Sequence, residues 1–172
     1  MHVPLVLTDF LDRAAELYAD KIGMINDDRY ITYRQLKERV NQLSHGLYSL
    51  GIRKGDRVAY LAPNTLEMLE GFYGIFQIGA IMVPLNIRLK PEDYLFMLNH
   101  SESKVLFVDQ DLYHLIQPVK DRLATVEHII VHYKDSDNEE LDYDRWLSMF
   151  STNEIERPEI HEEDVCSLLY TS

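Results

Sequence analysis

Residues 55–86 read GDRVAYLAPNTLEMLEGFYGIFQIGAIMVPLN, and two short apolar runs flank a helical pattern in this stretch. The first run, residues 58–62, follows a Gly-Asp turn signal and has the length of a buried strand. The second run, residues 81–83, ends at Pro84, which cannot donate to a sheet ladder. Apolar residues at three- and four-residue spacing between the runs predict a helix that ends near Gly79. A strand, a helix and a strand in this order predict two parallel strands joined by a helical crossover.

The same alternation continues on both sides of this unit. Upstream, residues 30–33 predict a short strand that enters a helix, with Thr32 and Gln35 as a capping box and Gly51 as the stop. The central helix is expected to be capped by Asn64 with Glu67. The remaining predicted elements are helices over 91–100 and 111–123, strands over 105–108, 129–131 and 165–170, and a short helix around Trp146. The sequence therefore predicts an α/β fold in which residues 1–172 form one domain, an open, mostly parallel sheet with helices on both faces.

The composition fits one globular domain and argues against nucleic-acid binding. The chain has 172 residues, of which 46% are hydrophobic and 27% charged, and this is enough for a sizeable core. Lys plus Arg number 17 and Asp plus Glu number 29, so the net charge is -12, whereas phosphate backbones are bound by clustered cations. Residues 1–90 have a net charge of +1 and residues 91–172 one of -13. An anionic ligand is therefore expected to prefer the first half.

The cysteine count and the apolar runs predict the cellular context. Cys166 is the single cysteine, so the chain can form neither an internal disulfide nor a multi-cysteine metal site. The N-terminus lacks a basic region, and its apolar stretch ends at Thr8, unlike a signal peptide. The longest weakly polar run, residues 71–85, is too short to span a bilayer. We therefore expect a soluble protein in the reducing cytoplasm, without a transmembrane segment.

The spacing of His128 and His132 argues against their binding one metal ion. His128 and His132 enclose two isoleucines and a valine, which favour a strand. On a strand, residues four apart lie roughly 13 Å from each other, too far for one ion. The acidic residues 161–164 are better explained as a solvated connector than as a cation site. No metal site is predicted from the sequence.

Other residues that often carry chemistry also have structural explanations. The chain contains neither a dinucleotide fingerprint nor a P-loop. Gly71 and Gly74 share a predicted helix, where close packing on a strand explains them. Cys166 lies beside an apolar strand without a nearby base, which predicts a buried structural thiol.

Two sites for an anion remain. Arg88 follows the strand at residues 81–83, and open α/β sheets bind ligands beyond the carboxyl ends of their strands. A solvated cation on a surface loop is the alternative for Arg88. At the other site, a predicted strand runs into Thr171 and Ser172, whose hydroxyl groups suit a phosphate-binding loop. Spacing alone favours a bare strand end there.

Three stretches in order resemble the core motifs of the adenylate-forming enzymes. Residues 31–36, ITYRQL, resemble the first motif, with Gln35 in place of the usual Glu. Residues 76–86, FQIGAIMVPLN, resemble the second, and residues 168–172, LLYTS, resemble the opening of the third, Tyr-Thr-Ser-Gly-Thr-Thr-Gly-x-Pro-Lys-Gly. The likeness covers nearly the whole chain. The form PLNIRL at residues 84–89 is more similar to acyl-CoA synthetases, such as long-chain fatty-acid CoA ligases, than to peptide-synthetase adenylation domains.

This resemblance implies the first subdomain of the N-terminal AMP-binding domain and an acid-thiol ligase. Family members use ATP, usually with Mg²⁺, to convert a carboxylate into an acyl-adenylate and pyrophosphate, and then transfer the acyl group to CoA. Thr171 and Ser172 would begin the nucleotide-binding phosphate loop, and Arg88 is the candidate contact for a CoA phosphate. The apolar face of residues 66–76 is expected in the core, with a border on an acyl pocket as the alternative. No catalytic residue is implied within the chain.

The resemblance also implies that most of the enzyme's machinery is absent from these 172 residues. The rest of the phosphate loop, the adenine and ribose segments and the mobile C-terminal domain have no counterpart here. We therefore expect a truncated N-terminal portion that is inactive alone, and whose cut sheet edge allows a homodimer. Two alternatives remain: adenylation of an amino or aryl acid, and a non-catalytic α/β binding module.

Overall fold

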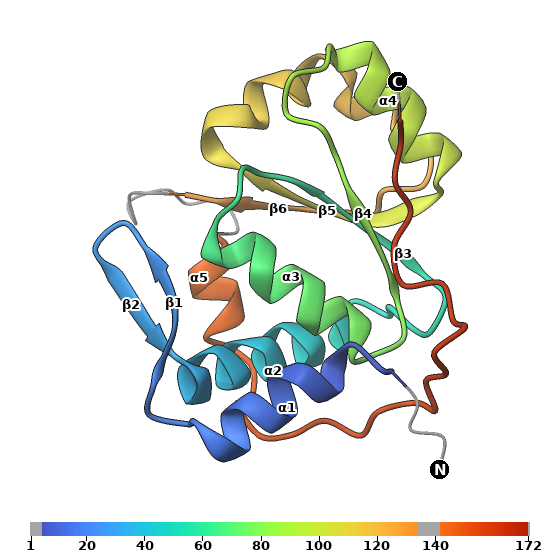
Figure 1. The fold of residues 1–172 in the computed structure, drawn as a ribbon. Coiled ribbons are helices and arrows are strands. Elements are labelled where there is room, and N and C mark those ends of the chain that lie inside the picture. Colours follow the sequence, from blue (N-terminus) through green and yellow to red (C-terminus); the bar gives the residue numbers. More distant parts are fainter. Residues whose placement is uncertain (1–4, 134–141, 172) are drawn as a thin grey trace.

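A parallel sheet of four strands forms the centre of the molecule. The computed structural model describes residues 5–133 and 142–171. Within them the strands follow the order β4-β3-β5-β6, and each neighbouring pair is parallel (Figure 1). Their bounds are Arg57–Leu61 for β3, Ile81–Pro84 for β4, Ser103–Asp109 for β5 and His128–His132 for β6. The α/β class and the open parallel sheet are thereby confirmed.

Helices cover both faces of this sheet. One face carries α2 (Tyr33–Ser49), α3 (Leu66–Phe76) and α5 (Tyr143–Leu147), and α1 (Thr8–Leu17) packs against α2 and α3. The other face carries α4 (Pro91–His100) and the 3₁₀-helices η1 (Gln110–Leu115) and η2 (Gln117–Arg122). None of the helices in the described ranges combines the length and apolar character needed to cross a membrane.

Strand β3 shows why its sequence reads as a continuous apolar run. Val58 and Tyr60 belong to the core between the sheet and α2, α3 and α5, whereas Ala59 and Leu61 belong to the core on the α4 side. All four side chains are at most 1% exposed. Because successive side chains point to opposite faces and both faces are covered, every position from Val58 to Leu61 is apolar.

A two-stranded hairpin precedes the sheet. Strands β1 (Ile22–Asn26) and β2 (Arg29–Thr32) pair antiparallel, and Thr32 then caps α2. The Thr32 hydroxyl accepts from the Gln35 N–H, and the Gln35 side chain accepts from the Thr32 N–H, so the predicted capping box is confirmed. Neither β1 nor α1 was expected, and most residues of both elements are exposed or only partly buried.

Two predictions about helices were wrong. Residues 111–123 form η1 and η2 rather than one helix, because Pro118 lacks an N–H and disfavours helical backbone at the residue before it. The N-cap of α3 is Thr65 rather than Asn64, since the Thr65 hydroxyl accepts from the Met68 N–H at 3.4 Å.

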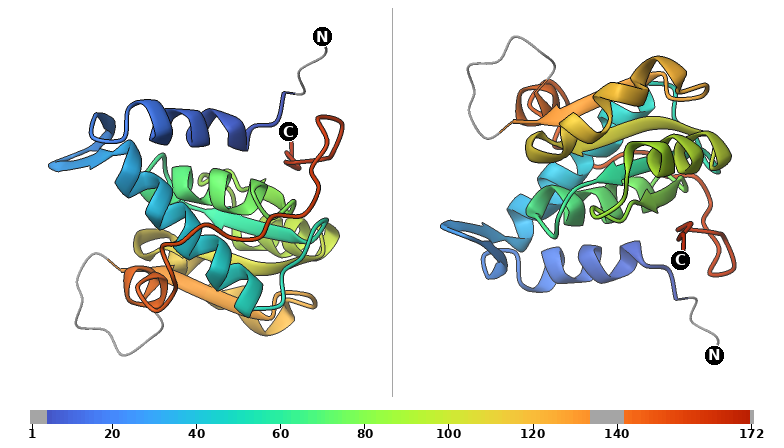
Figure 2. Two further views of the ribbon diagram at one scale, coloured as in Figure 1. Left: turned by 90° about the horizontal axis from the view of Figure 1, so that it is seen from below. Right: turned by 90° about the horizontal axis from the view of Figure 1, so that it is seen from above.

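The last part of the chain, residues 150–171, forms an extended segment that we call the C-terminal strap. It crosses α2 on its way from α5 to the C-terminus (Figure 2). Along this path the side chains of Asn41 and Tyr48 donate to strap carbonyl groups at 2.9 and 3.2 Å. The strap then meets the sheet through a single parallel bridge between Ser167 and Met82. The predicted buried strand over 165–170 is therefore wrong, because only this bridge pairs and Leu169 is exposed.

Candidate functional site at the carboxyl edge of the sheet

The carboxyl ends of the four parallel strands meet at one edge, and two hollows lie there. One has a volume of about 430 Å³ and is lined by residues that follow β3 and β4, together with Met68 and Phe72 of α3. The other has a volume of about 760 Å³ and is polar, with Asp109 and His132 at the ends of β5 and β6. Because ligands of open α/β sheets bind at this edge, both hollows are candidate sites.

Arg88 lies in the turn that follows β4, next in the chain to Ile87, which lines the first hollow. The Arg88 N–H donates to Asn86 Oδ1 at 3.0 Å, and the Tyr94 hydroxyl donates to the Asn86 carbonyl at 2.8 Å. These contacts fix the backbone of the turn from both sides. The guanidinium itself is exposed and makes no hydrogen bond or ion pair within the described part of the chain. The arrangement leaves a cation at the ligand edge available to an anion.

Thr171 lies at the end of the C-terminal strap, on the β4 side of the sheet. The strap runs parallel to β4 past Ser167, and Tyr170 anchors its end on α4, where the tyrosine hydroxyl lies 2.8 Å from His100 Nδ1 and 3.3 Å from the Met97 carbonyl. Thr171 itself is exposed. Ser172, the second residue of the expected phosphate loop, lies outside the described residues.

The polar hollow contains three ligand-type side chains from three elements, which we call the Glu67 cluster: Glu67, His132 and Asp144. Glu67 Oε1 lies 3.4 Å from His132 Nε2, and Asp144 Oδ2 lies 3.7 Å from the same nitrogen. Arg29 of the hairpin donates to Glu67 Oε1 at 2.7 Å. The cluster thus joins α3, β6 and α5 through one imidazole.

A second set of contacts supports the Glu67 cluster from beneath. Arg39 of α2 donates to Asp144 Oδ1 at 2.7 Å and to both carboxylate oxygens of Glu70. The Tyr143 hydroxyl donates to Glu70 Oε2 at 2.8 Å. Glu70 is completely buried, so Arg39 and Tyr143 provide the partners that water would otherwise supply.

The charges in this hollow shift one another's pKa values. Burial raises the pKa of Glu70 despite the guanidinium of Arg39. Burial also opposes the ionisation of Glu67, but His132 and Arg29 outweigh it and lower its pKa. His132 and Arg39 hold the pKa of Asp144 well below its usual range. Burial lowers the pKa of His132, yet the carboxylates of Asp144 and Glu67 outweigh it, so the net shift is upward.

The structure supports the separation of the two histidines that the sequence indicated. His128 and His132 are the two ends of strand β6, and His128 is exposed. Of these two histidines, only His132 has other possible metal ligands nearby, namely carboxylate oxygens of Glu67 and Asp144. Sequence spacing alone could not indicate this group, because its other members lie far away in the chain.

The expected close packing on a strand is confirmed for Gly71 and wrong for Gly74. A Cβ atom at Gly71 would lie 2.6 Å from Cζ of Tyr60, on strand β3. A Cβ atom at Gly74 would lie 2.7 Å from a methyl carbon of Leu43. Gly71 therefore packs on a strand, whereas Gly74 packs on helix α2.

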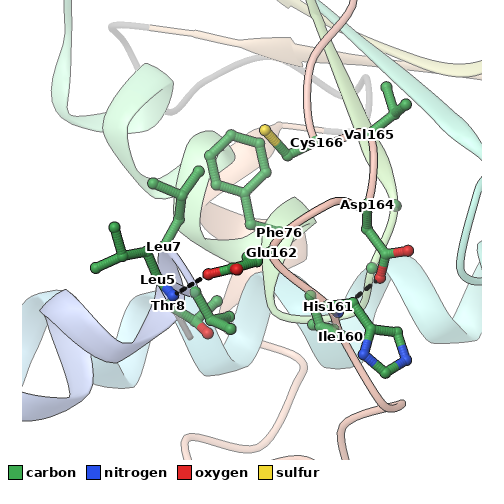
Figure 3. A pocket seen from close by; sticks show the side chains of 13 residues that line it. Leu5, Leu7, Thr8, Phe76, Ile160, His161, Glu162, Asp164, Val165 and Cys166 are labelled. Carbon is green, nitrogen blue, oxygen red and sulfur yellow. Dashed lines mark hydrogen bonds between the residues drawn. The ribbon is translucent and has the colours of Figure 1, made fainter. Parts of the chain in front are cut away.

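Cys166 lies in a small hollow between the N-terminal segment and the C-terminal strap. This hollow of about 50 Å³ is lined by Leu5, Phe76 and Val165 among others, and Figure 3 shows the thiol at its edge. Cys166 is half-buried, so the prediction of a buried thiol was wrong, because the strap covers the surface instead of entering the core. The predicted acidic connector is largely exposed, although Asp164 binds Lys54 at 2.6 Å.

Sequence reasoning missed the residues of the polar hollow. Glu67 was assigned to a helix cap, and Arg39, Glu70 and Asp144 were not singled out. A signal was present, because Glu67 and Glu70 interrupt the most apolar helix of the chain at a spacing that puts both on one face. Their hydrogen-bond partners, however, lie up to 73 residues away in the chain, as Tyr143 does from Glu70.

Together, the parallel sheet and the helices on both faces define an open α/β protein, and the polar residues at the carboxyl edge lie where such proteins bind ligands. The chain belongs to the AMP-binding enzyme family, whose sequence profile matches residues 11–172.

Individual relatives are CoA ligases. The chain is 32% identical over 176 residues to a long-chain-fatty-acid–CoA ligase of Thermus thermophilus. It superposes with a TM-score of 0.92 and 32% identity on an anthranilate CoA ligase in complex with anthranoyl-AMP. It superposes on a Mycobacterium tuberculosis fatty acyl CoA synthetase with a TM-score of 0.86 and 29% sequence identity. These comparisons cover 100%, 100% and 96% of this chain but 32%, 33% and 32% of the relatives, so the chain spans about a third of their length.

Proposed function

We propose that this chain is the N-terminal portion of an ATP-dependent acyl-CoA ligase, with a fatty acid as the favoured substrate. The reaction joins a carboxylate to ATP, which gives acyl-adenylate and pyrophosphate. The thiol of CoA then displaces AMP and forms the thioester. The observation that carries the proposal is the match to the AMP-binding enzyme family over residues 11–172. The choice of a fatty acid is supported by the likeness to the long-chain-fatty-acid–CoA ligase of Thermus thermophilus.

Arg88 is proposed to contact a phosphate of CoA. Its guanidinium is exposed, lies beyond the carboxyl end of β4 and has no partner in the described residues, while the Asn86 turn fixes the backbone below it. A guanidinium binds phosphate through two parallel hydrogen bonds, which suits this role.

Thr171 and Ser172 are proposed to begin the loop that binds the phosphates of ATP. The support is the exposed hydroxyl of Thr171 at the end of a strap that Tyr170 anchors on α4. Mg²⁺ is proposed to accompany ATP and to neutralise charge on the phosphates.

The hollow lined by Met68 and Phe72 is the proposed border of the acyl pocket. It opens at the same edge as Arg88, and its volume of about 430 Å³ suits an apolar chain. The observation that supports the alternative substrate, an aryl acid, is the likeness to the anthranilate CoA ligase. A cytoplasmic location is proposed because a single cysteine suits a reducing compartment.

The first experiment reads the coding DNA beyond the codon for Ser172 and then assays the encoded protein. A continuation as Gly-Thr-Thr-Gly and carboxylate-dependent exchange of pyrophosphate into ATP are the expected results. Fatty and aryl acids of increasing size would rank the substrates. A stop codon with no exchange would leave the binding-module alternative. The 172-residue chain alone is expected to show no exchange, because it contains only two residues of the phosphate-loop motif.

The role of Arg88 is tested in the same encoded protein. Arg88→Ala should raise the KM for CoA about tenfold or more, since one charge-assisted contact is worth about 1.5–3 kcal/mol. Pyrophosphate exchange, which precedes CoA binding, should not change. Lys90→Ala removes the same charge two residues away and serves as the matched control. An equal effect of both variants would show a general charge effect instead of a contact.

A further inference from the structure

We propose that Glu67, His132 and Asp144 form a binding site for one divalent cation, with Zn²⁺ as the preferred ion. The site lies in the polar hollow on the β6 side of the sheet, whereas Arg88 and Thr171 lie at the β4 side. It is therefore separate from the proposed Mg²⁺–ATP site.

The distances within the Glu67 cluster fit the first coordination sphere of a small ion. Zn²⁺ binds nitrogen and oxygen at about 2.0–2.2 Å in a tetrahedron, so its ligand atoms lie about 3.4 Å apart. His132 Nε2 lies 3.4 Å from Glu67 Oε1 and 3.7 Å from Asp144 Oδ2. All three ligand atoms lie within 4.8 Å of one another. One imidazole with two carboxylates suits Zn²⁺, because imidazole is a poor ligand for Mg²⁺ and Ca²⁺.

The local charge favours a cation. Carboxylates outnumber guanidinium groups around this hollow: Asp27, Glu67, Asp109 and Asp144 line it and Glu70 lies beneath it, against Arg29 and Arg39. A divalent cation would offset this excess of negative charge in a partly buried place where net charge is costly.

The two arginines support the ligands without occupying every lone pair. Arg39 binds Asp144 Oδ1, which leaves Oδ2 directed at His132. Arg29 binds Glu67 Oε1 at 2.7 Å, and a carboxylate oxygen accepts through two lone pairs. Hydrogen bonds of this kind hold ligating carboxylates in place around a metal ion.

A buried hydroxyl beside the cluster lacks a partner. The side chain of Tyr60 is 1% exposed, and its hydroxyl has no hydrogen-bond partner among residues 5–133 and 142–171. Tyr60 lines a cavity of about 10 Å³ together with Glu67 and His132. Three protein ligands leave a fourth position for water on Zn²⁺, and such a water would give Tyr60 a partner.

The test measures Zn²⁺ binding to the 172-residue chain by titration calorimetry after removal of metal with a chelator. One Zn²⁺ per chain is expected. His132→Gln and Asp144→Asn should each weaken binding at least tenfold. His128→Gln is the matched control, because His128 is the exposed histidine at the other end of the same strand. Circular dichroism without metal checks that each variant folds.

A wild-type chain that binds no Zn²⁺, or equal losses in His128→Gln and His132→Gln, would overturn the proposal. Should His132→Gln fail to fold, the wild-type chain decides the question by NMR of its imidazole nitrogens. Zn²⁺ should shift the signals of His132 and leave those of His128 in place, and the reverse pattern would also overturn the proposal.

Discussion

Arg39 pairs with two carboxylates, and one of them, Glu70, is removed from water by the fold. Glu70 accepts from Arg39 and from Tyr143 on the buried side of α3. A buried pair of this kind gives little net stability relative to apolar residues, but breaking it leaves an uncompensated charge. Removing Arg39 should therefore destabilise the folded chain strongly.

Arg39→Met should reduce the free energy of unfolding by about 3–5 kcal/mol, because Glu70 would stay buried without its cation. Arg34→Met is the matched control on the same helix, since Arg34 pairs with an exposed Asp20 at 3.1 Å. Its expected cost is about 0–1 kcal/mol. Urea unfolding of both variants gives the comparison, and equal costs would contradict the prediction.

Gly71→Ala should destabilise the chain by about 1–2 kcal/mol, although alanine ordinarily favours a helix. The added Cβ would lie 2.6 Å from Cζ of Tyr60, whose ring is stacked on Phe107 at a centroid distance of 4.6 Å. Thermal unfolding measures the loss. In a Tyr60→Leu background the same substitution should cost less, and an unchanged cost would exclude the ring as the cause.

At the scale of elements, ion pairs attach the C-terminal strap to the helices. Arg157 of the strap donates to Asp12 of α1 at 2.5 and 2.8 Å and to Gln77 at 3.0 Å. Lys37 of α2 also binds Asp12. Burial opposes the ionisation of Asp12, but the hydrogen bonds from Arg157 and Lys37 outweigh it and lower its pKa below 3.8.

The contact between Asp12 and Arg157 should make the free energy of unfolding depend on pH. A carboxyl whose folded pKa is lowered contributes stability above its unfolded pKa, and this contribution is lost as the pH falls through the folded value. The wild-type chain should therefore exceed Asp12→Asn in unfolding free energy at about pH 6, and the difference should shrink towards about pH 3. Asp9→Asn controls for the loss of one charge on α1. A difference that stays constant over this range would contradict the assignment.

At the scale of the whole molecule, the β4 edge is only partly covered. The strap pairs with β4 at one bridge, and Val165 and Leu169 of the strap are 61% and 69% exposed. Open sheet edges with apolar neighbours favour association between copies.

We therefore expect the 172-residue chain to dimerise through the β4 edge, which sedimentation velocity over a range of concentrations would measure. Leu169→Lys should weaken association. Leu17→Lys, at an exposed leucine of α1, is the control and should not. A chain that stays monomeric, or equal effects of both variants, would count against this edge as the interface.

Much of the fold could be predicted because its signals are local. The run at residues 58–62, the capping box of Thr32 with Gln35 and the stop near Gly79 act within a few neighbours. The helix predicted over 111–123 failed because Pro118 outweighed the apolar spacing. Arg88 could be chosen from the sequence as a candidate anion contact because it follows a predicted strand. The Glu67 cluster could not be predicted, because its members come from elements that are distant in the chain.

The sequence by itself determined the α/β alternation, the parallel sheet and the resemblance that led to the family, since periodicity and short motifs are properties of neighbouring residues. The tertiary structure alone decided which charges meet. It brings Glu67, His132 and Asp144 together from three elements, and it turns the end of the chain into a strap with one bridge instead of a strand. The physical reason is that burial and charge pairing depend on distance in space, which spacing along the chain does not give.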